Sequence, residues 1–412
     1  MMCTDSRSGL IYLDNAATTL VKPRGVRKAV DEAIRRCGSA GRSGHWASDR
    51  AAEVVFGCRA LAAELFHVGS PERIVFTFNA THALNIAINS VINGILTANG
   101  SRSKRVLISG YEHNSVLRPL FARKDEGIET VPVFSPPFEP EVFLHKLENE
   151  MERGAGAVVC THVSNVFGYI IPIERVDEMC ARRGIPLVVD ASQSAGCIGI
   201  DSGSFRAAKF ICMSGHKGLM GPQGTGILIC LGDEVLPFMF GGTGSDSRKP
   251  LMPDYLPERL EAGTLNVHGI AGLAEGIRFV MKLGEERILE HERAFIRRVI
   301  RGLEILPKVR VFQCERLFCQ TGVLSLSLRE GSCEETAAEL AARGICVRVG
   351  LHCSPLAHKS AGTLNTGTLR ISPSVFSRFR HADRFVDELG RILREKAETG
   401  GQRSKKYSCR QI

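Results

Sequence analysis

A lysine and an aspartate stand at the ends of two apolar runs in the segment 188–226. Asp190 closes the run "PLVVD", and Lys217 follows the run "FICMSG" within the glycine-rich sequence "SGHKG". Loss of water at the end of a buried strand lowers the pKa of a lysine and frees its amine as a nucleophile. A buried carboxylate in turn needs a cationic partner. The two residues together predict a reactive amine beside a fixed negative charge.

Pyridoxal phosphate (PLP) chemistry needs these two groups. A lysine forms a Schiff base with the cofactor, and an acid keeps the pyridine nitrogen protonated so that the ring withdraws electrons. Taken singly, each residue also has an ordinary explanation, as a lysine in a surface turn or as a salt-bridged aspartate in the core. Their occurrence together, with the further motifs below, favours a PLP site.

A cysteine with polar surroundings occurs late in the chain. Cys353 lies in "RVGLHCSPLAHK", in a turn with Gly350, His352 and Pro355, and Arg348 is nearby. Exposure and cationic neighbours favour the thiolate, which is the nucleophilic form of cysteine. The chain has 14 cysteines, none in a C-x-x-C pair, so the usual zinc spacings are missing. Most of the others are expected to be small buried residues.

The elements that must position these residues form an alternating pattern. Seven short apolar runs are expected to be strands, and helical patterns fall between most of them. Continuous apolar strands separated by helices indicate a mostly parallel sheet that is covered on both faces. The runs lie at 73–78, 105–109, 130–134, 157–164, 186–192, 210–215 and 226–231.

Two domains and a tail are predicted. Residues 15–262 form the large α/β domain, and residues 1–14 with 263–398 form a smaller α+β domain. The segment 241–266 is rich in glycine and proline, and a loop of this length is usually functional. The last helix is expected at about 381–396. Residues 399–412 contain four basic residues and no acid, which predicts a flexible basic tail.

Composition excludes several classes of protein. Of 412 residues, 44% are hydrophobic and 24% charged, and the net charge is +9. These values are typical of a folded globular protein rather than a disordered or fibrous one. No apolar stretch is long enough for a membrane helix, and the N-terminus lacks the pattern of a signal peptide. The expectation is a cytoplasmic protein without a nucleic-acid or membrane partner.

Taken together, the motifs of the chain resemble those of a known family. It is similar to the class V aminotransferase-type PLP enzymes of fold type I, in the cysteine desulfurase/selenocysteine lyase branch. The resemblance covers about residues 11–395. The motifs that carry it are "YLDNAATT", "FNATHALN", "EHNSVLRP", "THVSNVFG", "VVDASQ", "SGHKGLMGPQGTG", "EAGTLN", "RVGLHCSP" and "GTLRIS".

The resemblance implies a role for several residues around the cofactor. Lys217 would carry PLP, Asp190 would pair with the pyridine nitrogen, Gln193 would bond the phenolate oxygen, and His113 would stack on the ring. The phosphate would be held at a helix start, where backbone N–H groups point outward. The residues expected there are Ala80, Thr81 (which is also a candidate N-cap), Ser214 and His216. Thr264 would reach the phosphate from the other subunit, which implies a homodimer with shared active sites.

The same resemblance implies the substrate contacts. Arg370 in "GTLRIS" would bind the substrate carboxylate through a bidentate pair. Asn165 would contact that carboxylate or the ring oxygen. The remaining residues expected around the substrate or its entrance are Asn15, Ala16, Ala17, Arg348, Arg42 and His45, with Trp46 as either a lid or a packing residue.

The implied reaction is PLP-dependent conversion of L-cysteine to L-alanine. Cys353 would take the sulfur as a persulfide, and a sulfur-acceptor protein could then receive it. The short spacing from Cys353 to "GTLRIS" resembles the short-loop, SufS-type branch. The sequence departs from the family at Asn79 and Ala80, where a Gly-Thr pair is common, and at Ser192. No metal site is expected.

Other functions remain open at the level of sequence. Selenocysteine lyase or another class V lyase or aminotransferase would use the same pocket, although plain transamination needs no thiol such as Cys353. A non-catalytic sulfur-relay protein that keeps PLP structurally is the alternative from another class. A nucleic-acid module rests on the basic tail alone, and Cys409 in that tail is expected to be inert.

Overall fold

A computed structural model describes residues 9–41, 44–98, 100, 102–306 and 308–408. Two residues named in the sequence-based predictions, Arg42 and Cys409, lie outside the described residues. None of the helices in the described part of the chain combines the length and the apolar composition needed to cross a bilayer.

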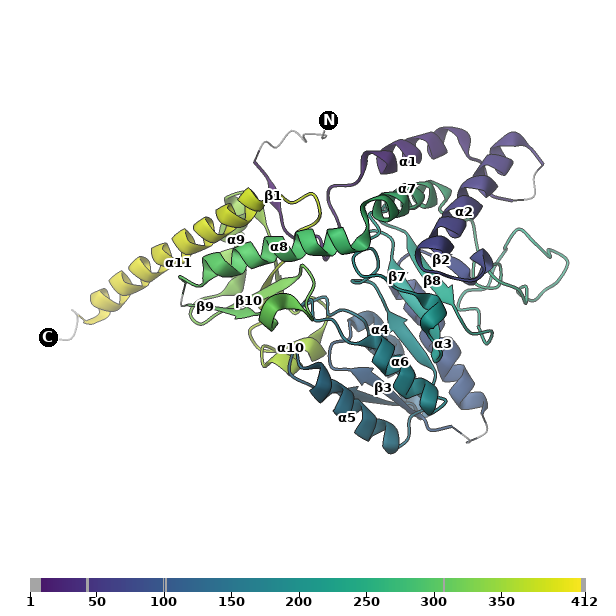
Figure 1. The fold of residues 1–412 in the computed structure, drawn as a ribbon, viewed down its shortest axis with the longest axis horizontal. Helices are drawn as coiled ribbons and strands as arrows, with labels where there is room; N and C mark the ends of the chain where they lie inside the picture. Colours follow the sequence, from purple (N-terminus) through teal and green to yellow (C-terminus); the bar gives the residue numbers. More distant parts are fainter. Residues whose placement is uncertain (1–8, 42–43, 99, 101, 307, 409–412) are drawn as a thin grey trace.

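A seven-stranded sheet forms the centre of the large domain (Figure 1). The strand order is β2-β8-β7-β6-β5-β3-β4, and β8 alone in this sheet runs antiparallel to its neighbours. This confirms the predicted α/β architecture with a mostly parallel sheet. The strands are β2 (Ile74–Thr77), β3 (Arg105–Ser109), β4 (Glu129–Val133), β5 (Ala157–Thr161), β6 (Leu187–Asp190), β7 (Ala208–Ser214) and β8 (Gly226–Cys230).

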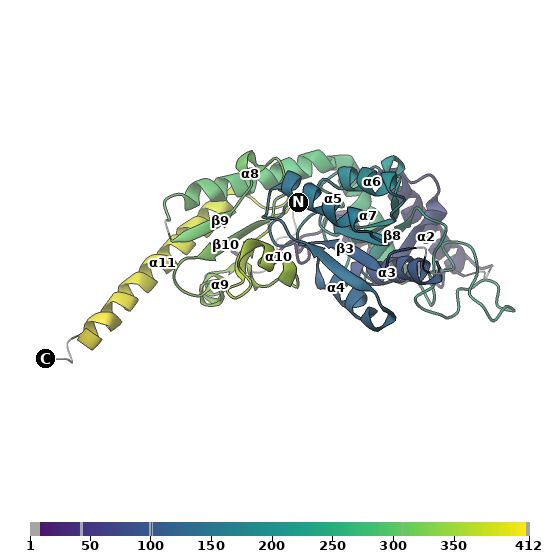
Figure 2. The ribbon, with the colours of Figure 1, turned by 90° about the horizontal axis from the view of Figure 1, so that it is seen from below.

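Helices cover both faces of this sheet. Successive strand residues point to opposite faces, so Leu107 of β3 belongs to one core cluster and Val106 and Ile108 to the other. Figure 2 shows the two helical layers above and below the strands. One layer contains α2 (Trp46–Leu65), α5 (Pro140–Glu152), α6 (Ile173–Arg182) and α7 (Val267–Leu283), with α1 (Arg24–Arg36) against α7; the other contains α3 (Ala80–Thr97) and α4 (Asn114–Phe121).

A second, antiparallel sheet forms the centre of the small domain, in the order β12-β13-β10-β9. A separate apolar cluster lies between this sheet and its helices. The N-terminal strand β1 (Ile11–Tyr12) joins this part of the molecule by pairing with β11 (Ile345–Cys346). The other elements are α8 (Glu285–Leu303), β9 (Val309–Phe312), β10 (Leu324–Leu328), α9 (Cys333–Ala342), β12 (Arg348–Gly350), α10 (Pro355–Ala361), β13 (Thr368–Ile371) and α11 (Phe379–Ser408).

The structure differs from the expected organisation in two helices. The boundary at 262/263 assigns α7 to the small domain, but Ile270, Leu273 and Ile277 of α7 belong to the core under the large sheet. Helix α11 continues to Ser408, whereas the sequence suggested an end near 396 and a flexible tail from 399. Polar residues after 396 provide no apolar periodicity, so the pattern could not extend the helix.

The long connection between β8 and α7 is anchored by a buried ion pair. Arg59 of α2 and Glu261 form two parallel hydrogen bonds of 2.9 and 2.8 Å, and both residues are less than a tenth exposed (5% and 8%). The Oε1 atom of Glu261 also accepts a hydrogen bond of 2.6 Å from the backbone N–H of Phe76 in β2. The ion pair thus fastens the end of the connection to the edge of the sheet.

Removing one partner of this pair should destabilise the protein strongly. A Glu261→Leu variant leaves the Arg59 charge buried and unpaired, which costs about 3–5 kcal/mol of unfolding free energy. Urea unfolding at one fixed protein concentration measures this loss. The exposed Arg50–Glu53 pair on the same helix provides the control, since Arg50→Ala should cost less than about 1 kcal/mol. Equal losses in the two variants would show that the buried pair is not the anchor.

Candidate active site

The residues expected to do chemistry lie where strands of the large sheet end. Asp190 is the last residue of β6, and Ser214 is the last residue of β7, three positions before Lys217. β3 ends four residues before His113, and β5 ends four residues before Asn165. Ligands of open α/β sheets bind at the carboxyl ends of strands. The topology therefore gathers the predicted residues at the carboxyl edge of the sheet, where its parallel strands end.

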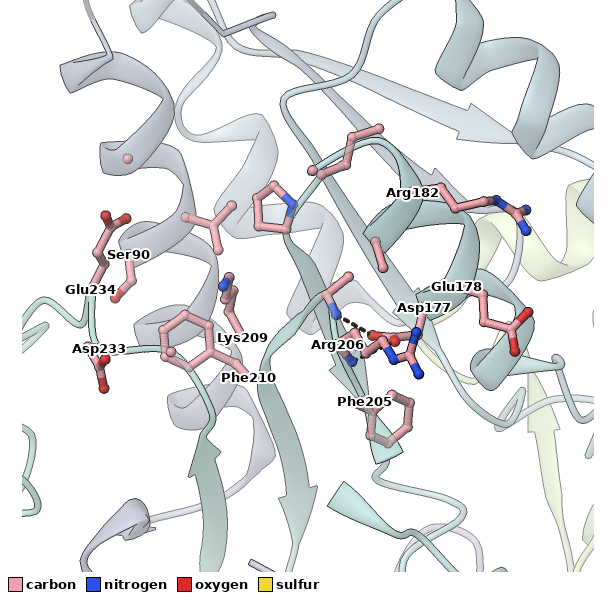
Figure 3. A pocket seen from close by; sticks show the side chains of 18 of the residues that line it. Ser90, Asp177, Glu178, Arg182, Phe205, Arg206, Lys209, Phe210, Asp233 and Glu234 are labelled. Atoms are coloured by element: carbon pink, nitrogen blue, oxygen red, sulfur yellow. Dashed lines mark hydrogen bonds between the residues drawn. The ribbon is translucent and has the colours of Figure 1, made fainter. Parts of the chain in front are cut away.

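The opposite edge of the sheet has a cavity of about 1100 Å³ (Figure 3). It is lined near the starts of β6 and β7, and Asp177 there accepts hydrogen bonds from the backbone N–H groups of Arg206 and Ala207. Both acidic and basic side chains line it, and none of the predicted catalytic residues belongs to it. Cavity volume alone would therefore select the edge opposite the predicted site.

The amine of Lys217 lies in a site that disfavours its charge. Burial lowers its pKa from 10.5 to about 8, and the positive charges of Arg370 and Arg348 act in the same direction. The carboxylate of Asp190 acts against these effects. With a pKa of about 8, about one amine in ten is neutral at pH 7. A lowered pKa is what the predicted nucleophilic role of Lys217 requires.

Asp190 is held in place by Ser192. Its Oδ1 atom accepts a hydrogen bond of 2.9 Å from the backbone N–H of Ser192 and a second one from the Ser192 hydroxyl. A carboxylate with fixed donors keeps its charge at a defined position. Ser192, which looked like a departure from the family pattern, therefore has a local function beside Asp190.

His113 lies within reach of both charges. It precedes α4, where its Nδ1 atom accepts a hydrogen bond of 3.1 Å from the backbone N–H of Ser115. Burial lowers the pKa of His113, Asp190 raises it, and Lys217 lowers it. The ring is therefore neutral near pH 7. The charges of Asp190 and Lys217 both act on this ring, and its expected place against a flat cofactor stays a prediction.

Arg370 connects the small domain to this edge. It is 2% exposed on β13, and its Nη2 atom bonds Oδ1 of Asp14 at 2.7 Å. Its Nη1 atom donates to the backbone oxygen of Asn165 at 2.7 Å, and its Nε atom has no hydrogen-bond partner among the described residues. Arg348 is the cross-strand neighbour of Arg370 and lies 3.8 Å from Asp14. Two arginines and one acid leave a positive charge that suits a carboxylate.

Cys353 is the exposed thiol among the cysteines that the structure describes. It follows β12 in the small domain. Its backbone oxygen accepts a hydrogen bond of 2.8 Å from the N–H of Asn114, the residue after His113. The turn that carries the thiol is therefore fastened to the start of α4, beside the groups around Lys217.

The start of α3, where the phosphate is expected to bind, differs from the prediction in the residue that caps the helix. Ala80 and Thr81 begin α3 as expected, but Asn79 is the N-cap, since its side chain accepts a hydrogen bond of 2.9 Å from the N–H of His82. The suggestion that Thr81 caps the helix is therefore wrong. The Nε2 atom of His82 is buried without a hydrogen-bond partner, and the Nδ1 atom of His216 lies 3.1 Å from the Thr18 hydroxyl.

The remaining predicted residues fall into three groups. Gln193 and Asn15 use their amides to bond backbone oxygens, of Ala16 at 3.0 Å and of Ser372 at 2.9 Å, and thus fasten the N-terminal segment. His45 caps α2, where its Nδ1 atom accepts a hydrogen bond of 3.3 Å from the backbone N–H of Ser48. Thr264 is exposed and lines a small cavity with Phe78 and His82 of the same chain.

Sequence reasoning missed two acids at this edge. Asp14 bonds Arg370, although "YLDNAATT" gave no hint of that partner. Glu112 is fully buried, and its Oε1 atom accepts a hydrogen bond of 2.8 Å from the N–H of Thr161 and another from the Ser109 hydroxyl. Burial raises the pKa of Glu112 to about 8, so this acid is largely neutral. Its place directly before His113 was the available signal.

Comparison with known proteins gives a consistent result. The aminotransferase class-V family model matches residues 11–385. A probable cysteine desulfurase of Pyrococcus abyssi is 31% identical over 93% of this chain and 94% of its own length. A cysteine desulfurase of Cronobacter sakazakii is 29% identical over 93% of this chain and 94% of its own length.

Solved structures of cysteine desulfurases are also similar to this chain. An apo cysteine desulfurase from Thermococcus onnurineus superposes with a TM-score of 0.83 at 30% identity, over 94% of this chain and 95% of that one. The cysteine desulfurase CsdA from Escherichia coli, at 23% identity and a TM-score of 0.80 over 94% of this chain and 95% of its own, has the same fold. The chain thus belongs to the class V aminotransferase family, in the branch of the cysteine desulfurases.

Proposed function

We propose that this protein is a PLP-dependent cysteine desulfurase. It converts L-cysteine to L-alanine and takes the sulfur onto Cys353 as a persulfide. The observation that carries this proposal is the exposed Cys353, whose turn is bonded to the residue after His113. A thiol in this place has no use in a plain aminotransferase. The relatives named as cysteine desulfurases support the same activity.

The side chains at the strand ends fit PLP as a cofactor. Lys217 offers an amine with a lowered pKa, and Asp190 offers a fixed carboxylate for the pyridine nitrogen. The first turn of α3 provides free backbone N–H groups for a phosphate, and the buried Nε2 atom of His82 beside it lacks a partner. Ala80, Thr81, Ser214 and His216 would complete the phosphate site, with His113 against the ring.

Each of the chain's own side chains has a different role in the proposed reaction. When bound, PLP withdraws electrons from the substrate's α-carbon. The amine of Lys217, with a pKa of about 8, accepts a proton in its neutral form and returns it afterwards. Ser192 keeps the Asp190 charge in place, so no reorganisation is needed when charge develops. Arg370 and Arg348 hold the substrate carboxylate, which orients the rest of the molecule.

Among the chain's own side chains, the thiol of Cys353 is the one that would accept the sulfur, once PLP has withdrawn electrons from the substrate. The Cys353 thiolate attacks the sulfur of the substrate, so a sulfur–sulfur bond forms while the bond between that sulfur and the substrate's β-carbon breaks. The electron pair of the broken bond stays on the three-carbon fragment, which takes up protons and leaves as alanine. Atoms balance without any external oxidant or reductant. The persulfide can then pass its outer sulfur to an acceptor protein, which we propose as a partner.

We also propose that two copies of the chain form a homodimer with shared active sites. The connection between β8 and α7 exposes large apolar side chains, with Phe240 77% and Leu251 80% exposed. Several large apolar side chains exposed on one connection favour an interface there. Thr264 near the end of this connection would then reach the phosphate of the partner's cofactor. A cytoplasmic location agrees with the free thiols of the described cysteines.

Replacement of Lys217 should abolish the visible absorbance of bound PLP. Lys217→Ala removes the amine that holds the cofactor, so the purified variant should lack this band while its circular dichroism stays unchanged. Lys209→Ala is the matched control, because Lys209 lies near the start of β7, at the opposite end of the strand that precedes Lys217. Its absorbance should equal that of the wild type. A normal band in Lys217→Ala would contradict the assignment.

Replacement of Cys353 should separate cofactor binding from sulfur transfer. Cys353→Ser should keep the PLP absorbance and lose nearly all alanine formation from cysteine, since a hydroxyl cannot accept the sulfur. Cys37→Ser, at the half-buried end of α1, should turn over at the wild-type rate. The rate of alanine formation is measured for both variants and the wild type in the presence of a reductant. Turnover at the wild-type rate by Cys353→Ser would exclude the thiol mechanism.

A mixing experiment tests the sharing of sites. Lys217→Ala and Thr264→Val chains each lack one part of the site, so each homodimer should bind PLP poorly. If Thr264 acts across the interface, refolded mixtures should contain one intact site per heterodimer, and tight PLP binding should return in that fraction. If Thr264 serves its own chain, where it lies near His82, mixing should restore nothing, and the shared site would be disproved.

A further inference from the structure

The turn that carries Cys353 has an unusual backbone. His352 and Cys353 are consecutive residues with φ angles of 50° and 58°, in the left-handed region. Residues with a side chain are rarely found there, and such conformations persist only where the surroundings hold them. The turn lies between β12 and α10, and contacts from both domains hold it.

The side-chain amide of Asn165 bonds the turn on both sides of Cys353. Its Nδ2 atom donates to the backbone oxygen of His352 at 2.8 Å, and its Oδ1 atom accepts from the Ser354 hydroxyl at 2.6 Å. The reverse orientation of the amide would place its oxygen against the His352 oxygen. The amide therefore needs its NH₂ group toward His352, and an acid at this position would repel that carbonyl.

Two more contacts complete the support of this turn. The backbone N–H of Asn114 donates to the oxygen of Cys353 at 2.8 Å. The Nε2 atom of the buried His352 ring lies 3.1 Å from the Thr368 hydroxyl. Both carbonyl groups of the strained pair thus have a donor, and the His352 ring is anchored in the small domain.

Asn165 is itself fixed by the arginine of the site. Its backbone oxygen accepts the 2.7 Å hydrogen bond from Nη1 of Arg370. The turn around it is closed by hydrogen bonds between Ser164 and Tyr169 and between Gly168 and Ser164. One residue therefore joins the arginine expected to bind the substrate carboxylate to the turn that carries the thiol.

We propose that Asn165 is a positioning residue whose side-chain amide holds the His352–Cys353 turn in its left-handed conformation and so fixes the place of the thiol. This proposal rests on the proposed function only in naming Cys353 as the nucleophile. This positioning role is distinct from the expected contact of Asn165 with the substrate carboxylate or the ring oxygen, and the turn uses one of the two N–H donors of its amide.

Hydrogen exchange of the holoenzyme tests the clamp without any turnover. In Asn165→Asp, the repelled carbonyl should release the turn, and exchange of the peptide covering 351–361 should rise by about tenfold, the effect expected for loss of one buried hydrogen bond. Ser354→Ala removes the other contact and should produce a smaller rise. Asn149→Asp, an exposed change of the same kind on α5, should leave this peptide unchanged.

Kinetics then distinguish positioning from binding. If Asn165 positions the thiol, the kcat for alanine formation falls by about tenfold in Asn165→Asp while KM for cysteine and the PLP absorbance stay near wild type. Unchanged exchange in both variants would overturn the proposal, as would a raised KM or an altered PLP spectrum at unchanged exchange. A wild-type protein that forms no alanine would refute the proposed function, and the exchange comparison would still decide the clamp.

Discussion

The loss of water around the Lys217 amine is the constraint on which the site depends. Parallel strands bring Asp190 and Lys217 to one edge of the sheet, where burial disfavours the charged amine and the nearby carboxylate favours it. Arg370 and Arg348 tip this balance toward the neutral form. The pKa of about 8 follows from the competition between these effects, not from any one residue. A sheet edge open to water would leave the amine charged and unreactive.

The small domain contributes to the lowered pKa of Lys217 through its two arginines. Arg370 and Arg348 lie side by side on β13 and β12, and both approach Asp14 near the N-terminus of the chain. The same sheet leads into the turn that presents Cys353, and hydrogen bonds from Asn114 and Asn165 cross from the large domain to that turn. The two arginines and the thiol are therefore positioned relative to the amine by contacts between the two domains rather than within either.

Sequence patterns predicted the elements better than the contacts between them. The seven apolar runs became the seven strands because both faces of the sheet are buried, which leaves a continuous apolar signature. Lys217, Asp190 and His113 were predicted as site residues because each lies at the end of a strand or shortly after it, in a recognisable motif. The packing of α7 against α2 was not predictable, since amphipathic spacing does not say which core a helix joins. The bonds of Asp14 to Arg370 and of Asn165 to the Cys353 turn join residues about 190 or more positions apart, and no local pattern reports them.

The central claim, one site that unites the Lys217 amine with the Cys353 thiol, can be tested in a single turnover. The holoenzyme is mixed with L-cysteine without reductant, and alanine is counted against sulfur bound at each cysteine by peptide mass spectrometry. The account predicts one alanine for each extra sulfur atom on the peptide that contains Cys353. Alanine that accumulates while Cys353 stays unmodified, or sulfur that collects on another cysteine, would contradict it.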